Sequence, residues 1–141
     1  MRFVAVPVRG GRAVKDGNVR RARVLVIDDE PLIAKVLGRM LGETREVTIA
    51  FSGKQALDVI ERDTSFDVIL CDLMMPEITG MGVYAELAQR SPELARKMVF
   101  MTGGAFTEAA ADFLQRVAPL QIAKPFRRAE VEDAVAQVLA S

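Results

Sequence analysis

Residues 67–80 read D-V-I-L-C-D-L-M-M-P-E-I-T-G, and this stretch decides the fold. After Asp67 it has an apolar run over residues 68–71, continues with a carboxylate, Asp72, and then has two methionines and Pro76. A short apolar run bounded by a polar residue and a Pro/Gly turn is typical of a buried strand that ends in a loop. We therefore expect Asp72 at the carboxyl end of a central strand, where open α/β sheets bind their ligands.

Taken alone, an aspartate at such a position more often only caps a loop, so the rest of the chain has to decide. Four further apolar runs occur at residues 24–27, 47–51, 98–101 and 120–123. Segments with apolar residues at helical spacing follow Pro31, Ser52, Gly80, Thr107 and Phe126. Strands that alternate with helices predict parallel β-α-β units, with helices on both faces of the sheet. We expect an α/β fold with a doubly wound, flavodoxin-like parallel sheet of five strands in the order 2-1-3-4-5. Five helices would accompany it, with a break at residues 91–93.

Composition narrows the function classes. The 141 residues predict one domain, and the 50% hydrophobic content is ordinary for a globular protein. The chain has no histidine, which excludes a histidine-ligated zinc, a Ser-His-Asp triad and a phosphohistidine of its own. No apolar run approaches the roughly 18 residues of a membrane span, and no signal peptide is evident. A single cysteine fits a reducing compartment, so a cytoplasmic location is expected.

Charge divides the chain into two parts. Residues 1–23 contain seven basic side chains and one acidic side chain, whereas the remainder contains 12 basic and 18 acidic ones. Residues 10–21 also lack periodicity and are rich in Gly, Arg and Asn. This pattern predicts a basic arm or linker over residues 1–22 and one folded domain over residues 23–141.

Polar residues follow four of the five predicted strands. The first strand is followed by Asp28 and Asp29, the third by Asp72, the fourth by Thr102 and the fifth by Lys124. In the expected strand order the switch point lies between the first and third strands, so the carboxylates should cluster there. Clustered carboxylates repel one another and need a cation or protons. Oxygen ligands without histidine favour Mg²⁺, and a hydroxyl and an ammonium opposite it would form a cradle for a phosphoryl group.

Four motifs carry a family resemblance. They are V-L-V-I-D-D-E-P at residues 24–31, V-I-L-C-D-L-M-M-P at 68–76, V-F-M-T-G-G at 99–104 and I-A-K-P-F at 122–126. In this order and spacing they resemble the receiver domain of two-component response regulators, over about residues 23–139. The resemblance implies a phospho-accepting switch rather than an enzyme with a turning-over substrate. Its phosphoryl donor would be a histidine kinase or a histidine phosphotransfer protein.

The resemblance also assigns roles by position. Asp72 would accept the phosphoryl group as an aspartyl phosphate. Asp29 and Asp72 would bind Mg²⁺ through their side chains and Met74 through its backbone carbonyl, while Asp28 would support the water shell of the metal.

Thr102 would bond a phosphoryl oxygen, Lys124 would pair with the phosphate, and the Lys124–Pro125 bond would be cis. Two neighbouring residues are given structural roles rather than functional ones. Cys71 is expected in the core, and Glu30 is expected as a solvated residue of a first helical turn rather than a supporting acid.

Two departures from the family pattern concern signal output and lifetime. Many receivers have an aromatic residue three positions before the lysine, where this chain has Gln121. We therefore expect a smaller or different rearrangement on phosphorylation. The positions two residues beyond Asp72 and Thr102 are Met74 and Gly104, which offer no acid or amide to orient water. Slow self-dephosphorylation is expected.

The sequence is compatible with two protein contexts for this domain. The chain is either a single-domain regulator or the terminal receiver of a hybrid sensor kinase, because residues 3–7 resemble a strand of kinase ATP-binding domains. The sequence shows no DNA-binding helix-turn-helix, so we expect output through a partner protein, without direct DNA or membrane contact. A homodimer through the fourth helix, fifth strand and fifth helix is a further possibility.

Rival classes fit the residues less well. An aspartate-nucleophile phosphohydrolase would resemble D-x-D at the first strand, but this chain has Asp28-Asp29-Glu30 and no cap domain. A flavin-binding module would need a phosphate-cradling loop there, and these carboxylates would repel the phosphate. A non-phosphorylated scaffold is disfavoured because every acidic, hydroxyl and lysine position of the family is present.

Overall fold

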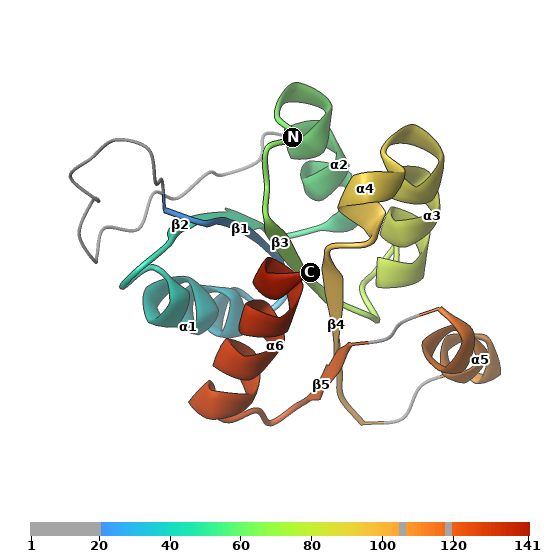
Figure 1. The fold of residues 1–141 in the computed structure, drawn as a ribbon. Helices are drawn as coiled ribbons and strands as arrows, with labels where there is room; N and C mark the ends of the chain where they lie inside the picture. The colour runs from blue at the N-terminus through green and yellow to red at the C-terminus, as the bar shows by residue number, and fades with distance from the viewer. Residues whose placement is uncertain (1–20, 105–106, 118–119) are drawn as a thin grey trace.

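The computed structural model describes residues 21–104, 107–117 and 120–141. The predicted basic arm over residues 1–22 therefore lies outside the described part, except for its last two residues. The strands are β1 (Arg23–Ile27), β2 (Glu46–Ala50), β3 (Val68–Asp72), β4 (Met98–Thr102) and β5 (Gln121–Ala123). They form one parallel sheet in the order β2-β1-β3-β4-β5, which confirms the predicted topology (Figure 1).

Six helices are described rather than the five predicted. They are α1 (Pro31–Leu41), α2 (Gly53–Arg62), α3 (Gly80–Arg90), α4 (Pro92–Ala95), α5 (Glu108–Arg116) and α6 (Arg128–Ala140). The extra helix is α4, in the segment where a break was predicted. Its first residue, Pro92, suits a first helical turn. Leu94 and Ala95 then bury against the core, so one turn of helix forms instead of an irregular loop.

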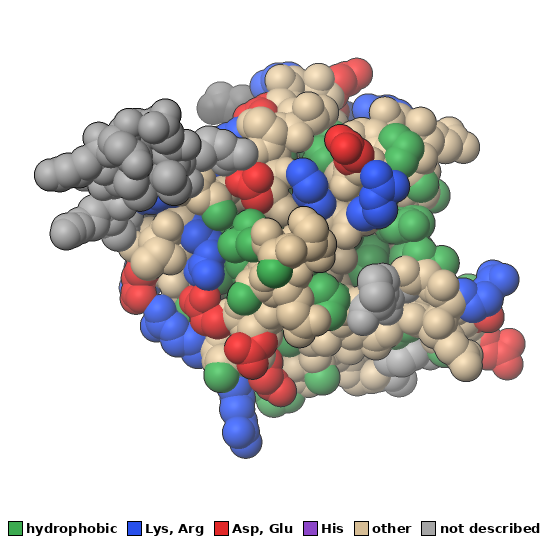
Figure 2. Space-filling view, viewed as in Figure 1, with side chains coloured by type: hydrophobic (Ala, Val, Ile, Leu, Met, Phe, Trp, Pro, Cys, Tyr) green, Lys and Arg blue, Asp and Glu red, His purple; other side chains and the backbone are tan. Residues whose placement is uncertain are grey.

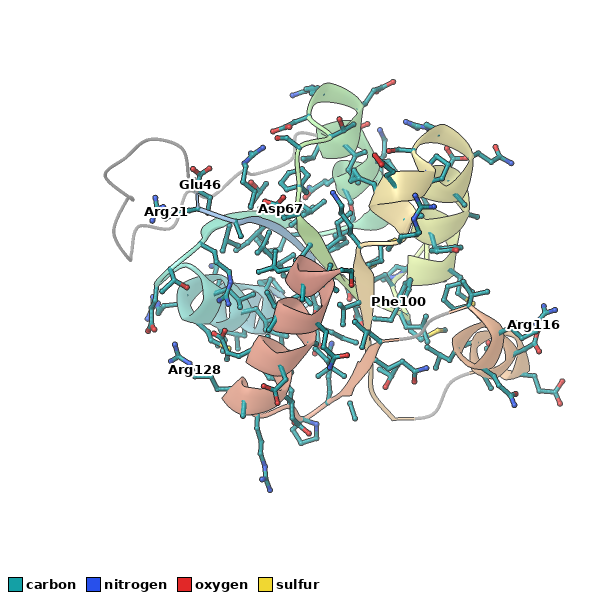
Figure 3. All side chains as sticks on the ribbon, in the orientation of Figure 1. Arg21, Glu46, Asp67, Phe100, Arg116 and Arg128 are labelled. Atoms are coloured by element: carbon teal, nitrogen blue, oxygen red, sulfur yellow. The ribbon has the colours of Figure 1, made fainter. Side chains whose placement is uncertain are left out.

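The sheet is buried on both faces, which explains why its strands have nearly continuous apolar sequences. Leu25 and Ile27 of β1 belong to one core cluster, with α2, α3, α4 and α5, and Val24 and Val26 to the other, with α1 and α6. Figure 1 shows α1 and α6 together on one face of the sheet. Beside the edge strand β5, Phe100 of β4 (Figure 3) meets Phe113 of α5 edge to face, with ring centroids 5.1 Å apart.

Hydroxyl caps begin three of the helices. Ser52 accepts a hydrogen bond from the Gln55 amide at 3.1 Å, and Thr107 accepts one from the Ala110 amide at 3.1 Å. In the sequence, both hydroxyl residues directly precede a segment with apolar residues at helical spacing. Thr79 begins α3 in the same way, accepting from the Gly82 amide at 3.2 Å. Each cap satisfies one backbone N–H that a helix start leaves without a partner.

Charged side chains of both signs are mixed on the face of the protein that Figure 2 shows. In the view of Figure 2, Lys and Arg side chains of the described residues lie beside Asp and Glu rather than in one basic stripe. At the amino-terminal edge of the sheet, where Glu46 and Asp67 lie (Figure 3), Arg23 pairs with Asp63 at 2.8 Å. Among the described residues, no helix is long and apolar enough to cross a bilayer.

Gly80 fixes the loop that follows β3. Its amide donates to the Leu73 carbonyl at 2.8 Å, and a Cβ at this position would lie only 2.6 Å from the Asp72 carbonyl oxygen. A side chain here would therefore push against the backbone that carries Asp72.

We predict that Gly80→Ala lowers the free energy of unfolding by about 1–3 kcal/mol, the usual cost of overpacking a buried contact. Urea denaturation measures this. Gly103→Ala is the control, because the atoms nearest to a Cβ there belong to the Lys124 side chain and lie at an ordinary contact distance, 3.5 Å or more. Equal stability of the two variants would contradict the proposed close approach.

Candidate functional site

The carboxyl ends of the strands bring the predicted polar residues to one edge of the sheet. Asp72 is the last residue of β3, and Asp28 and Asp29 directly follow β1. Thr102 ends β4, opposite Ala123 in β5, so Lys124 comes one residue beyond that pair. The parallel register therefore brings all five residues to one edge of the sheet, as expected from the apolar runs together with the doubly wound strand order.

The three aspartates form a compact cluster. Each of Asp28, Asp29 and Asp72 offers a carboxylate oxygen, and these oxygens lie within 4.8 Å of one another. Asp28 is fully buried, and Asp72 is 7% exposed. Oxygen atoms at this spacing match the donor set that Mg²⁺ prefers, with waters completing the coordination shell. The residues therefore fit the predicted cation.

Burial and crowding change the acidity of the cluster. Burial is the main cause that raises the pKa of Asp72 to about 7, and the charge of Asp28 adds to this, while Lys124 counteracts it. Burial likewise raises the pKa of Asp28, although its carboxylate accepts hydrogen bonds from the Glu30 amide at 2.9 Å and from Lys124. The cluster thus carries more negative charge than this pocket stabilises by itself.

Lys124 supplies positive charge to the cluster. Its ammonium lies 3.0 Å from Asp28 Oδ2, 3.5 Å from Asp72 Oδ1 and 3.4 Å from Glu30 Oε1. Burial alone would lower the pKa of Lys124, but the hydrogen bond to Asp28 and the charges of Asp28 and Asp72 outweigh it and raise that pKa. The lysine therefore stays protonated at neutral pH.

The remaining predicted residues surround this centre. Thr102 is half-buried, and its backbone carbonyl accepts from the Lys124 amide at 2.7 Å. Met74 lies in the loop after β3 with 38% of its surface exposed. The Lys124–Pro125 peptide bond is cis, as the resemblance implied. Cys71 is fully buried in the core, as predicted.

Comparison with known proteins agrees with this geometry. A family model of the response regulator receiver domain matches residues 24–136. This chain belongs to the response regulator receiver family.

Curated relatives of this receiver are longer proteins. It is 34% identical over 105 residues to protein-glutamate methylesterase/protein-glutamine glutaminase 5 of Myxococcus xanthus, covering 73% of this chain and 30% of that protein. It is 32% identical over 116 residues to the positive alginate biosynthesis regulatory protein of Pseudomonas aeruginosa, covering 79% of this chain and 45% of that protein. The receiver thus spans less than half the length of these relatives.

Solved structures of receivers have the same fold. The receiver domain protein from Clostridium thermocellum superposes with a TM-score of 0.76 at 26% identity, covering 84% of this chain and 94% of that chain. A response regulator described as putative, from Chloroflexus aurantiacus, gives 0.75 at 27% identity, covering 86% of this chain and all of that chain.

Sequence reasoning missed one contact of the site. Glu30 is exposed, as predicted, but its carboxylate also reaches Lys124. A signal was available in the motif, because Glu30 directly follows Asp28 and Asp29 at the same strand end. Helical spacing alone could not reveal the direction of its side chain.

The raised pKa of Asp72 makes stability dependent on pH. The folded state disfavours an ionised Asp72, so the metal-free receiver should lose stability as the pH rises from about 4, near the ordinary aspartate pKa of 3.8, to about 7. We predict that Asp72→Asn raises the free energy of unfolding at pH 8 by about 1–2 kcal/mol, less than the full shift implies because water screens part of the site.

Denaturation in EDTA at pH 4.5 and pH 8 tests this prediction. The gain should nearly vanish at pH 4.5, where Asp72 is already neutral. A variant that is less stable than the wild type at pH 8 would show that Asp72 is not held in a repulsive cluster.

Proposed function

We propose that this receiver is a phospho-accepting switch in which Asp72 takes a phosphoryl group from a phosphohistidine of a kinase or phosphotransfer protein. The observation that carries the proposal is the aspartate cluster: carboxylate oxygens of Asp28, Asp29 and Asp72 lie within 4.8 Å of one another, and the Lys124 ammonium pairs with two of these carboxylates. An Asp72 oxygen would form the new P–O bond while the P–N bond of the donor breaks and the histidine nitrogen keeps the electron pair. Asp72 acts as the nucleophile in this step.

The other residues position and neutralise charge in this proposal. Asp29, Asp72 and the Met74 carbonyl would hold Mg²⁺, and Asp28 would support its waters. When bound, the metal would supply positive charge to the carboxylates and to the phosphoryl oxygens. Lys124 would pair with the phosphoryl group, and the Thr102 hydroxyl would donate to one of its oxygens.

The output of the switch would be read by a downstream protein. The face formed by α5, β5 and α6, the last helix–strand–helix unit of the chain, is the proposed surface for a partner or a second copy. Gln121 on this face donates from its side chain to the Leu114 carbonyl at 3.1 Å, so it links β5 to the last turn of α5. We propose residues 23–141 as the receiver domain, preceded by a basic arm or linker over residues 1–22.

We predict that acetyl phosphate and Mg²⁺ add one phosphoryl group to the protein, measured as intact mass. Asp72→Asn should abolish the addition, because it removes the nucleophile, and EDTA should suppress it. Glu61→Gln, an exposed change in α2, is the matched control and should behave as the wild type. Equal phosphorylation of Asp72→Asn would overturn the assignment of the acceptor.

The decay of this added mass after removal of the donor measures the lifetime of the aspartyl phosphate. Met74 and Gly104 offer no group that orients a hydrolytic water, so we expect the phosphoryl group to persist for minutes or longer. Loss within seconds would show that another group of the receiver catalyses hydrolysis.

A further inference from the structure

Glu30 is the exposed member of the carboxylates around Lys124. The side chains of Asp28 and Asp72 are 0% and 10% exposed, whereas that of Glu30 is 60% exposed. Its Oε1 atom still lies 3.4 Å from the Lys124 ammonium, close to the 3.5 Å that separates the ammonium from Asp72. The ammonium is thus shared between the acceptor carboxylate and a carboxylate at the mouth of the site.

The position of Glu30 at the start of α1 does not explain this contact. Glu30 is the N-cap residue of α1, but its side chain makes no capping hydrogen bond. By contrast, α2, α3 and α5 begin with hydroxyl caps on Ser52, Thr79 and Thr107. The backbone amide of Glu30 donates to the Asp28 carboxylate at 2.9 Å, which holds the Glu30 backbone next to the aspartate cluster. The Glu30 carboxylate therefore does not cap helix α1 and instead contacts Lys124.

We propose that Glu30 is a positioning residue that retains the Lys124 ammonium at the mouth of the site and so opposes phosphorylation of Asp72. This inference rests on the proposed function, because it concerns the regulation of that same site. Lys124 contacts Glu30 in the unphosphorylated receiver and must turn toward the phosphoryl group once that group is on Asp72. A contact made in only one of two states shifts the equilibrium toward that state.

Two effects of Glu30 act in the same direction. Its contact with Lys124 competes with the incoming phosphoryl group for the ammonium. Its negative charge at the mouth also repels an anionic donor, an effect that salt would screen. Removal of this carboxylate should therefore favour transfer to Asp72, whereas removal of Lys124 itself would leave the buried Asp28 without its cation.

The first experiment measures the rate of phosphorylation by acetyl phosphate and Mg²⁺ in three variants. Glu30→Gln should raise the rate about twofold to fivefold, the range expected for an exposed ion-pair partner. Glu61→Gln removes a charge in the last turn of α2, at the opposite end of that helix from the site, and should leave the rate unchanged. Glu30→Asp keeps the charge but withdraws the carboxylate by one methylene, so it should also raise the rate.

A second readout does not depend on phosphoryl transfer. The side-chain ¹⁵N resonance of Lys124, assigned by its loss in Lys124→Arg, should shift between the wild type and Glu30→Gln in phosphate-free buffer. With Mg²⁺ and beryllofluoride, which imitates the phosphoryl group, the two proteins should give the same Lys124 resonance, because the contact with Glu30 is then lost.

The outcomes separate this inference from the proposed function. Identical Lys124 resonances in the phosphate-free wild type and Glu30→Gln would overturn the role of Glu30, even if Asp72 is phosphorylated normally. A Glu30→Asp rate equal to the wild-type rate would reduce Glu30 to a repulsive charge and also overturn the role. Weaker Mg²⁺ binding by Glu30→Gln in a titration without donor would make Glu30 a support for the metal instead. Failure of the wild type to accept any phosphoryl group would refute only the proposed function.

Discussion

The ion pair between Lys124 and Asp28 is the interaction on which the site depends. Asp28 is fully buried, and its carboxylate lies 3.0 Å from the ammonium. A buried carboxylate without a partner would cost several kcal/mol, so the loop after β5 and the end of β1 are tied together. The same ammonium then stands beside Asp72. The pair therefore links the integrity of the folded sheet edge to the chemistry proposed for the acceptor.

The sheet makes this pair possible by register. Lys124 lies 96 residues beyond Asp28 in the chain, yet both follow parallel strands whose carboxyl ends meet at one edge. One lysine is insufficient for the charge gathered there, because the pKa of Asp72 still rises to about 7. A site with unneutralised negative charge at neutral pH is suited to bind a divalent cation, and a bound cation would keep Asp72 ionised and able to act as a nucleophile.

The sequence predicted the parts of this arrangement that follow from local patterns. Apolar runs followed by Asp28, Asp72, Thr102 and Lys124 predicted the strands and the sheet edge at which these residues meet, and the doubly wound fold class supplied the strand order. The sequence did not predict helix α4. Its four residues are too few to show helical periodicity, and burial of Leu94 and Ala95 decides the conformation. The contact of Glu30 with Lys124 was also missed, since it depends on side-chain direction across two loops. The sequence showed Gln121 at the position where many receivers have an aromatic residue. Its hydrogen bond to the Leu114 carbonyl depends on how α5 packs, so the sequence could not show it.

The central claim is that the aspartate cluster holds a cation and Lys124 responds to a phosphoryl group on Asp72. Its most direct test is a crystal structure with Mn²⁺ and beryllofluoride, in which anomalous scattering locates the metal. We expect one metal peak bound by Asp29, Asp72 and the Met74 carbonyl, with the Lys124 ammonium on a fluoride and released from Glu30. A metal bound elsewhere, or Lys124 still paired with Glu30 beside a beryllofluoride on Asp72, would contradict this account.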